Sequence, residues 1–280
     1  MPAIPIQLHY RQWGSPDGDS LPVLMLHGHP GNGAAMEVFG DFLASQRWAI
    51  APDLRGYGRS QVKDSYELET HLDDSIALLD RLNIQQCLIL GWSLGGILAL
   101  ELAIRYPDRI RGLVLVATAA RPRSNHPPIS MADNVWTAIA GLLNWVFPGQ
   151  KWIVETAGKR SLFRYLIQRH TPTAYRYLAR AAVPAYLQTS RHAHRALSRA
   201  LQNRYSCLDR LPPLQMPALV LAGSEDRHIT CEASAETARA LGRSQWIAYP
   251  NTAHLFPWEI PLQVQEDIGK WLQLQQELLG

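Results

Sequence analysis

The sequence has few cysteines and no long uninterrupted apolar run. Its three cysteines, Cys87, Cys207 and Cys231, are an odd number and do not stand at the spacing of a metal site, which suits a reducing compartment better than a disulfide framework. Charge or proline interrupts every apolar run well before the ~20 residues that a transmembrane helix needs. The N-terminal stretch MPAIPIQLHYRQWG also lacks the apolar core of a secretory signal. These absences predict a cytoplasmic protein with no transmembrane segment.

Acidic residues are scarce in the middle of the chain. Residues 119–212 contain 14 Lys or Arg and three acids, a balance of +11, whereas the rest of the chain has 13 basic and 21 acidic residues. The net charge of +3 therefore conceals two regions of opposite sign. The basic region has three interpretations: a solvated face, a surface for an anionic membrane, or a site for an acidic carrier protein or anionic substrate. We expect no nucleic-acid partner.

Strand-like and helix-like segments alternate over the first 118 residues and again after residue 212. Short continuous apolar runs predict strands at 23–26, 48–51, 87–90, 113–117, 218–222 and 245–249. Longer segments with helical periodicity predict helices at 34–45, 68–82, 94–106, 231–241 and 261–279. Continuous apolar strands interleaved with helices predict an α/β fold with a mostly parallel central sheet and helices on both faces.

The basic middle region has no strand signal. Its sequence predicts several helices, separated by the prolines Pro148, Pro172 and Pro184. We therefore expect residues 1–118 and 213–280 to form the two parts of one α/β core, with residues 119–212 inserted between them as a helical domain.

The stretch GWSLGG, residues 91–96, joins a predicted strand to a predicted helix through a single serine. A nucleophile on such a sharp turn adopts a strained backbone conformation, and larger side chains two residues away would collide. Gly91 and Gly95 meet that requirement, and Gly96 allows the helix to pack closely on the sheet. The N–H groups at the helix start can stabilise a developing negative charge. The pattern predicts that Ser93 is a nucleophile; the alternative is a merely tight turn.

Five stretches give the chain a resemblance to the α/β-hydrolase superfamily. They are LMLHGHPGNG (24–33), DLRGYGRS (53–60), GWSLGG (91–96), LAGSEDRHIT (221–230) and NTAHLFPWE (251–259). Their order and approximate spacing resemble those of the family over most of the chain outside the insertion. The insertion falls where the family has its cap, so the resemblance implies an α/β-hydrolase fold with an inserted helical cap.

The serine needs a base that takes its proton. The resemblance implies that this base is His254, which follows the last predicted strand in NTAHLFPWE. Ala253 stands where the family usually has glycine. His228 is the alternative base, because it lies beside the expected acid.

The acid that orients the base is expected on the loop after the strand at 218–222. Asp226 is the candidate there, and its neighbour Glu225 is a weaker one. Some family members place the acid after the strand that here ends at residue 117. Residues 109–131 contain no Asp or Glu, so that position is empty. The resulting chain order, Ser then Asp then His, is the order of this fold.

An oxyanion hole is expected from two backbone N–H groups. One belongs to Leu94, the residue after Ser93, and the other to the HGHPG turn. Pro30 has no N–H group, which makes His29 the candidate donor and Gly28 the fallback. The ring of His29 either lines the pocket or faces solvent.

Two other groups of polar residues invite a catalytic assignment. Asp53 in DLRGYGRS is a conspicuous carboxylate, but an Asp at a strand end commonly shapes the following turn. His192 and His194 have no nearby carboxylate or cysteine that could complete a metal site. We therefore expect no metal and no cofactor.

A serine nucleophile disfavours epoxide opening and halide displacement, for which relatives use an aspartate. It favours acyl transfer to water, with esters, thioesters, lactones, amides or certain carbon–carbon bonds beside a ketone as substrates. GWSLGG resembles the pimeloyl-acyl-carrier-protein methyl ester esterases, and the HGxPG turn resembles proline iminopeptidases and haloperoxidase-type esterases. The leading hypothesis is a carboxylesterase-type hydrolase of a small acyl substrate. A carbon–carbon bond hydrolase of ring-cleavage products and a ligand receptor or pseudoenzyme on the same fold are the alternatives.

The cap is expected to select the substrate. Apolar residues at helical spacing form one stripe there: Met131, Val135, Trp136, Ile139, Leu142, Leu143 and Val146. Together with Trp145, Phe147 and Trp152, this stripe forms either a lipophilic pocket wall or the internal core of the cap. The candidates for the substrate pocket are Trp92, Trp136 and Trp145.

Overall fold

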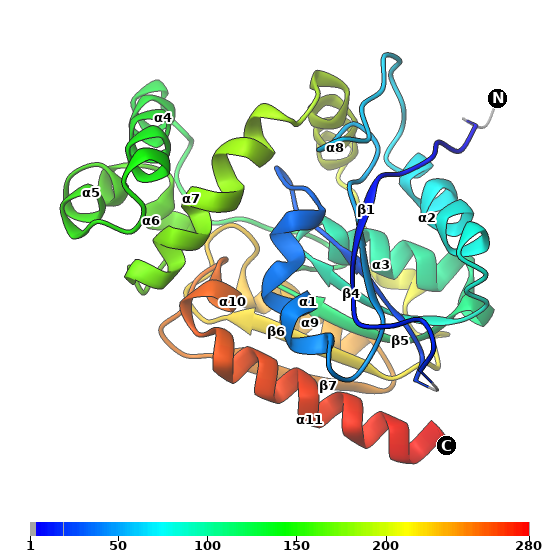
Figure 1. Ribbon diagram of the computed structural model, residues 1–280. Coiled ribbons are helices and arrows are strands. Elements are labelled where there is room, and N and C mark those ends of the chain that lie inside the picture. Colours follow the sequence, from blue (N-terminus) through cyan, green and yellow to red (C-terminus); the bar gives the residue numbers. More distant parts are fainter. Residues whose placement is uncertain (1–3, 19, 280) are drawn as a thin grey trace.

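A seven-stranded sheet forms the centre of the protein in a computed structural model that describes residues 4–18 and 20–279 (Figure 1). The strands are β1 (Tyr10–Trp13), β2 (Val23–Leu26), β3 (Ala49–Pro52), β4 (Cys87–Trp92), β5 (Ile110–Val116), β6 (Ala218–Gly223) and β7 (Ser244–Tyr249). Their order is β1-β3-β2-β4-β5-β6-β7, and every pairing is parallel except that of β1 with β3. The predicted mostly parallel sheet is confirmed.

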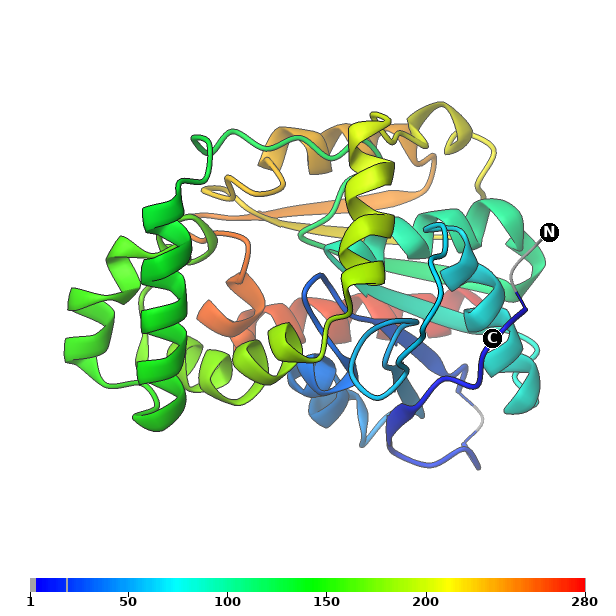
Figure 2. The ribbon, with the colours of Figure 1, turned by 90° about the horizontal axis from the view of Figure 1, so that it is seen from above.

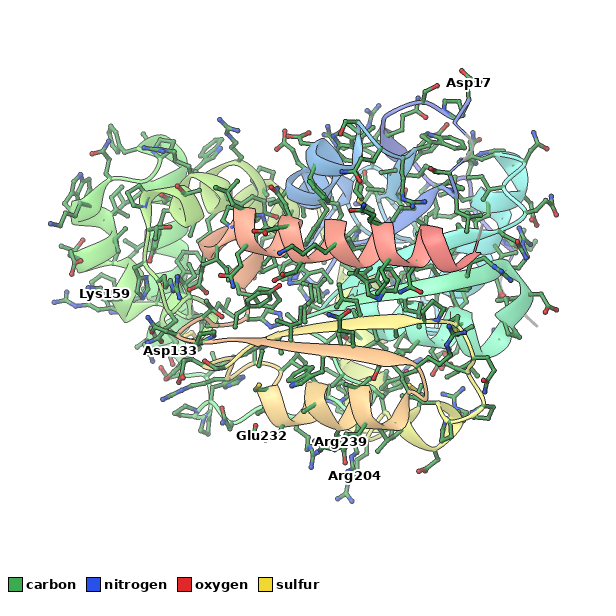
Figure 3. The ribbon with its side chains drawn as sticks, turned by 90° about the horizontal axis from the view of Figure 1, so that it is seen from below. Asp17, Asp133, Lys159, Arg204, Glu232 and Arg239 are labelled. Carbon is green, nitrogen blue, oxygen red and sulfur yellow. The ribbon has the colours of Figure 1, made fainter. Side chains whose placement is uncertain are left out.

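Helices cover both faces of this sheet. Those on one face are α1 (Glu37–Leu43) and α11 (Pro261–Leu279), and those on the other are α2 (Thr70–Arg81), α3 (Leu94–Arg105) and α9 (Cys231–Ala240). Figures 2 and 3 show α9 and α11 on opposite sides of the sheet. In β4, Ile89 packs with the α3 layer, whereas Leu88 and Leu90 pack with the α11 layer. Because both of their faces are buried, the strands β2, β3, β4 and β6 consist almost entirely of apolar residues.

The helical insertion lies between β5 and β6. It contains α4 (Met131–Val146), α5 (Lys151–Thr156), α6 (Phe163–Leu166), α7 (Pro172–Leu187) and α8 (Arg191–Gln202), and the described residues from 119 to 212 contain no strand. Helices α4 and α7 pack against each other, and α7 also contacts the short helix α10 (Phe256–Glu259). We refer to this insertion as the cap; its limits at 119 and 212 stay a prediction.

Three details of the fold differ from the sequence prediction. Strand β1 was not predicted, because its residues are half-buried or exposed and form no continuous apolar run. The segment predicted as one helix at 34–45 begins as a 3-10 turn, Gly33–Met36, before α1. Pro184 lies inside α7 and does not separate two helices. It stands in the last turn of α7, where few backbone hydrogen bonds follow the one that a proline removes.

The described helices include none that is both long and apolar enough to cross a bilayer. All three cysteines are free, with Cys87 and Cys207 buried. The cytoplasmic location stays a prediction.

Candidate active site

Ser93 occupies the turn between β4 and α3 in a strained backbone conformation. Its φ of 55° and ψ of −116° lie outside the regions that a side chain with a Cβ favours. Strand β5 and the residues after it fix the turn: the Ser93 N–H donates to the carbonyl of Val116 over 2.9 Å, and the Thr118 hydroxyl donates to the Ser93 carbonyl over 2.8 Å. The serine is therefore held by the centre of the sheet.

The glycines around Ser93 lie too close to their neighbours to carry a side chain. A Cβ on Gly91 would lie 2.4 Å from the carbonyl oxygen of Gly95, and one on Gly95 would lie 1.9 Å from that of Leu26. A Cβ on Gly96 would lie 2.2 Å from a side-chain carbon of Thr118. The close approaches agree with the requirement for small residues that the sequence indicated.

Three buried side chains form one hydrogen-bonded chain across the ends of β4, β6 and β7. Nε2 of His254 lies 3.1 Å from Oγ of Ser93, and Nδ1 of His254 lies 2.8 Å from Oδ2 of Asp226. The exposed fractions are 7% for Ser93, 4% for His254 and 3% for Asp226. The fold thus brings together the three residues that the sequence singled out, from loops far apart in the chain.

The carboxylate of Asp226 is oriented by its own loop. Its Oδ1 accepts hydrogen bonds from the backbone N–H groups of His228, over 2.8 Å, and Ile229, over 3.0 Å. The other oxygen is thereby left for His254. Glu225 is exposed and makes a backbone hydrogen bond to Thr252. The geometry favours Asp226 over Glu225 as the partner of the histidine.

His228 packs against His254 without replacing it. The two ring centroids are 4.7 Å apart in an edge-to-face arrangement, and the other side of His228 stacks on His126. Burial and the neighbouring imidazoles lower the pKa of His228 to about 3. It is therefore neutral near pH 7 and places no positive charge beside His254.

Glu259 joins the loop of His254 to the cap. Its Oε1 accepts from the N–H of Ala253 over 3.0 Å, and its Oε2 accepts from the N–H groups of Arg169, over 2.6 Å, and Gln168, over 3.2 Å. Burial raises the pKa of Glu259 above its ordinary value. This carboxyl therefore fixes the residue before His254 against the segment that connects α6 to α7.

The turn that contains the predicted oxyanion donor lies directly against Ser93. A Cβ on Gly28 would lie 3.1 Å from the Cβ of Ser93. His27 holds the turn: its Nδ1 donates to the Gly28 carbonyl over 2.8 Å, and its Nε2 accepts from the Leu54 N–H over 3.1 Å. Burial lowers the pKa of His27 to about 4, so the ring is neutral and can accept that bond. His27 therefore holds the turn in place.

Asp53 shapes the neighbouring turn, as the sequence indicated. Its carboxylate accepts from the backbone N–H groups of Gly33, over 2.7 Å, and Arg59, over 2.8 Å, and lies 3.1 Å from Nδ1 of His9. These bonds join the start of the 3-10 turn Gly33–Met36 to the DLRGYGRS turn.

The ring of His29 is half-buried between the core and α8. Its Nδ1 lies 2.8 Å from the hydroxyl of Tyr57, and its centroid lies 4.6 Å from that of His194. Burial and the adjacent histidines lower the pKa of His29 to about 3. The ring is not a solvent-facing loop histidine. In the described part of the chain, no group of three or more His, Cys, Asp or Glu is placed to hold a metal ion.

The three tryptophans assigned to the pocket have different surroundings. Trp92 is buried, and its ring centroid lies 5.9 Å from that of His254. Trp136 is half-buried inside the cap, with the guanidinium of Arg160 at 5.3 Å from its centroid. Trp145 lies on the outer side of α4 and is 53% exposed, because the apolar stripe of α4 is wider than the face that packs. Trp145 is therefore not placed as a pocket wall.

Two aromatic residues near the site were missed in the sequence. Trp258 contacts Trp92 edge-to-face, with centroids 4.6 Å apart, and stacks on Tyr177 of α7 at 4.1 Å. Because Trp258 follows His254 by only four residues, the sequence alone could have placed it near the site. Nothing in the local sequence indicated Tyr177, which reaches the site only because α7 packs on α10.

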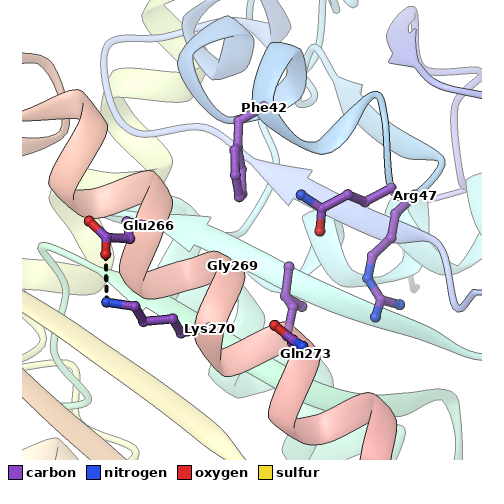
Figure 4. A pocket seen from close by; sticks show the side chains of 8 residues that line it. Phe42, Arg47, Glu266, Gly269, Lys270 and Gln273 are labelled. Atoms are coloured by element: carbon purple, nitrogen blue, oxygen red, sulfur yellow. Dashed lines mark ion pairs between the residues drawn. The ribbon is translucent and has the colours of Figure 1, made fainter.

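A separate surface pocket of about 260 Å³ lies between α1 and α11 (Figure 4). Its lining includes Phe42 and Arg47 on one side and the ion pair of Glu266 with Lys270 on the other. The residues of the hydrogen-bonded chain do not line it, so we assign it no part in the chemistry.

Comparison with known proteins relates the chain to hydrolases. Residues 22–261 match the model of a family described as alpha/beta hydrolase fold. A 2-hydroxymuconate semialdehyde hydrolase from Pseudomonas putida is 41% identical over 131 residues, which are 45% of this chain and 46% of that protein. A pimeloyl-[acyl-carrier protein] methyl ester esterase from Aeromonas hydrophila is 34% identical over 125 residues, 44% of each chain. The chain thus matches less than half of the length of these curated relatives.

A solved structure is similar over nearly the whole chain. It is a thermophilic esterase from Thermogutta terrifontis, with a TM-score of 0.69 and 29% identity, covering 95% of this chain and 93% of that one. The similarity therefore includes the cap as well as the sheet.

Proposed function

Because the chain belongs to the α/β hydrolase family and is a hydrolase enzyme, we propose that it cleaves a carboxylic ester through an acyl-enzyme on Ser93. The observation that carries this proposal is the hydrogen-bonded chain from Ser93 through His254 to Asp226. A serine hydroxyl is a weak nucleophile alone, and an adjacent oriented base is what activates it.

In the first half of the reaction, Nε2 of His254 accepts the proton of Ser93 as Oγ attacks the ester carbonyl carbon. Asp226 holds Nδ1 of His254, keeps the ring in the required tautomer and stabilises the imidazolium that forms. The proton then passes from His254 to the leaving alkoxide, which departs as the alcohol. In the second half, His254 removes a proton from water as its oxygen attacks the acyl carbon. His254 then returns that proton to Oγ of Ser93 as the bond between the acyl group and Oγ breaks, which releases the acid and restores the serine.

Two backbone N–H groups are proposed to stabilise the tetrahedral oxyanion. Leu94 is the first residue of α3, where N–H groups have no acceptor within the helix. His29 follows Gly28, which lies against Ser93. Donors fixed in this way need no rearrangement as charge develops on the carbonyl oxygen.

A carbon–carbon bond hydrolase is the second candidate. The observation that favours it is the identity of 41% to the 2-hydroxymuconate semialdehyde hydrolase. The same serine, histidine and aspartate could serve that reaction. We place the ester first because the solved esterase is 29% identical over 95% of the chain, whereas a solved meta-cleavage product hydrolase from Pseudomonas fluorescens covers 97% of the chain at only 20% identity.

Two measurements test the proposal. The first is labelling by a fluorophosphonate probe: we expect wild type to be labelled, Ser93→Ala to be unlabelled and Ser224→Ala, on the loop before Asp226, to be labelled like wild type. Labelling that persists in Ser93→Ala would overturn the assignment of the nucleophile.

The second measurement is turnover of p-nitrophenyl esters of graded chain length beside a panel of ring-cleavage dienedioates. We expect the esters to give the higher kcat/KM, with a burst of p-nitrophenol when deacylation is slow. If dienedioates are turned over and no ester is, the second candidate replaces the first.

A further inference from the structure

Helix α4 carries an exposed apolar face on the outside of the cap. Its members share a single side of the helix and are each at least 39% exposed: Met131, Val135, Ile139, Leu142, Trp145 and Val146. Most are spaced three or four residues apart, which places them in one stripe. We call these six residues the α4 face. Exposed apolar patches of this kind mark interaction sites.

Polar bonds on the opposite side of α4 hold this face outward. Asp133 is buried, accepts from Ser130 at the start of the helix and pairs with Arg164 over 2.5 Å. Asn144 is also buried: its amide donates to the Tyr175 carbonyl over 2.6 Å and accepts from the Gly149 N–H over 2.9 Å. Turning the α4 face inward would break these bonds, so its exposure is built into the cap.

Two further exposed aromatic side chains follow the α4 face in the chain. Phe147, directly after α4, is 51% exposed, and Trp152 on α5 is 50% exposed. Helices α4 and α5 lie at the opposite end of the molecule from α2, with no other element of the described chain beyond them (Figures 1 and 2). Tryptophan and phenylalanine are the aromatic residues that surface helices insert at the boundary between lipid headgroups and acyl chains.

The segment that contains the α4 face has a positive balance of charge. Residues 129–187 contain seven Lys or Arg and two acids, a balance of +5. Both acids are already paired, Asp133 with Arg164 and Glu155 with Lys159. An apolar face on a positively charged segment fits an occupant that combines apolar groups with negative charge.

We propose that the α4 face docks the enzyme on an anionic lipid surface. The apolar side chains enter the headgroup region, and basic residues beside them, such as Lys151 next to Trp152, contact the lipid phosphates. A second copy of the chain fits less well, because a symmetric contact would bring the same positive surroundings together. The proposal concerns where the enzyme binds and does not depend on which bond it cleaves.

Vesicle sedimentation with the full-length chain tests the docking. We expect binding to vesicles of phosphatidylglycerol and phosphatidylcholine and much weaker binding to phosphatidylcholine alone. The double variant Met131→Gln/Leu142→Gln should lower the partition coefficient about tenfold or more, because each side chain loses its transfer free energy. The matched control is Leu262→Gln/Leu274→Gln, two exposed leucines of α11, which should bind like wild type.

A charge variant tests the second part of the proposal. Lys151→Gln should weaken binding to the anionic vesicles about fivefold and leave binding to phosphatidylcholine unchanged, because one basic residue near such a surface contributes ~1 kcal/mol. Thermal melting of each variant shows whether it remains folded.

Three outcomes would overturn the proposal. The first is equal vesicle binding by the α4 and α11 double variants, and the second is no binding to anionic vesicles by wild type. The third is a dimer by light scattering that Met131→Gln/Leu142→Gln converts to monomer, which would make the α4 face an interface between copies.

Discussion

Strand β4 and helix α4 place apolar residues in opposite environments. Every residue of Cys87–Trp92 is buried, and this strand ends at a serine held in a strained conformation. In α4 the buried positions include Asp133 and Asn144, while the six apolar residues of the α4 face are exposed. The core thus uses apolar burial to fix a reactive group, whereas the cap uses polar bonds to present an apolar surface. The proposed catalytic site and the proposed docking surface therefore depend on opposite patterns of burial.

The largest expected effect is at the strained serine of the core. Ser93→Ala should lower kcat by ~10⁶, because the acyl-enzyme cannot form. Ser93→Gly should be equally inactive yet more stable than Ser93→Ala by ~1 kcal/mol, because glycine adopts this backbone conformation without strain. Ester turnover and thermal melting measure the two effects. Equal melting temperatures for the two variants would contradict the view that strain is stored at this turn.

The next effect concerns the group that orients the base. Asp226→Asn should lower kcat by ~10⁴, because the amide favours the wrong tautomer of His254. His228→Ala is the control: it removes an adjacent imidazole and should retain kcat within about tenfold, since only packing beside His254 changes. Full loss in His228→Ala together with activity in His254→Ala would show that the wrong histidine was assigned.

Acid should destabilise the core through its buried histidines. Burial lowers the pKa of His71 from 6.5 to about 3. Between these two pH values the unfolded chain binds a proton that the folded chain does not, so the free energy of unfolding falls as the pH falls. One such group contributes a slope of up to ~1.4 kcal/mol per pH unit.

His71→Leu tests this contribution. Urea unfolding between pH 7 and pH 4 should show that the free energy of unfolding falls less steeply with falling pH in the variant than in wild type. The difference in slope should correspond to about one proton. An unchanged slope would mean that His71 is protonated in the folded protein.

Within the cap, a buried polar side chain should contribute more to the free energy of unfolding than an exposed apolar side chain. Asn144→Ala removes two hydrogen bonds and should cost ~1–3 kcal/mol, because the Tyr175 carbonyl and Gly149 N–H lose their partner. Leu142→Ala on the α4 face should change the free energy of unfolding by less than ~0.5 kcal/mol. Chemical denaturation of both variants shows which substitution lowers the free energy of unfolding more. The reverse order would show that α4 packs through its apolar face.

The smallest expected effect concerns the charge of the cap. We propose that the basic residues of 119–212 attract an anionic substrate or an acidic carrier protein. The motivation is that this region has a charge balance of +11, whereas the rest of the chain has more acidic than basic residues. Reversing Arg176, Arg180 and Arg191 together should lower kcat/KM for an anionic ester less than about tenfold, as should salt, while a neutral ester is unaffected. An equal salt response for both esters would leave the charge as a solvated face.

The fold was largely predictable because its signals are local. Strands such as β2 and β6 are buried on both faces and read as continuous apolar runs, and the glycines of GWSLGG report a turn that needs no distant information. The α/β-hydrolase resemblance is confirmed by the family match. Strand β1 escaped prediction because only its pairing with β3 defines it. Pro184 was misassigned because packing around α7 tolerates a proline in its last turn.

The candidate site was predictable in identity but not in geometry. The resemblance pointed to Ser93, Asp226 and His254. Only the pairing of distant parallel strands in one sheet brings the loops of these residues within hydrogen-bond distance. Trp258 and Tyr177 meet because α7 packs on α10, a contact between distant segments.

The sequence by itself determined the parallel sheet, the strand-to-helix turn at Ser93 and the presence of an apolar stripe in α4, because periodicity and glycine placement act within a few residues. Only the tertiary structure decided which side of α4 meets water. Apolar residues at helical spacing indicate that a helix has an apolar face, but they do not indicate what packs against that face. The bonds of Asp133 to Arg164 and of Asn144 to Tyr175 keep the exposed face of α4 away from the interior of the cap. Both partners lie 31 residues along the chain, beyond the reach of any local signal.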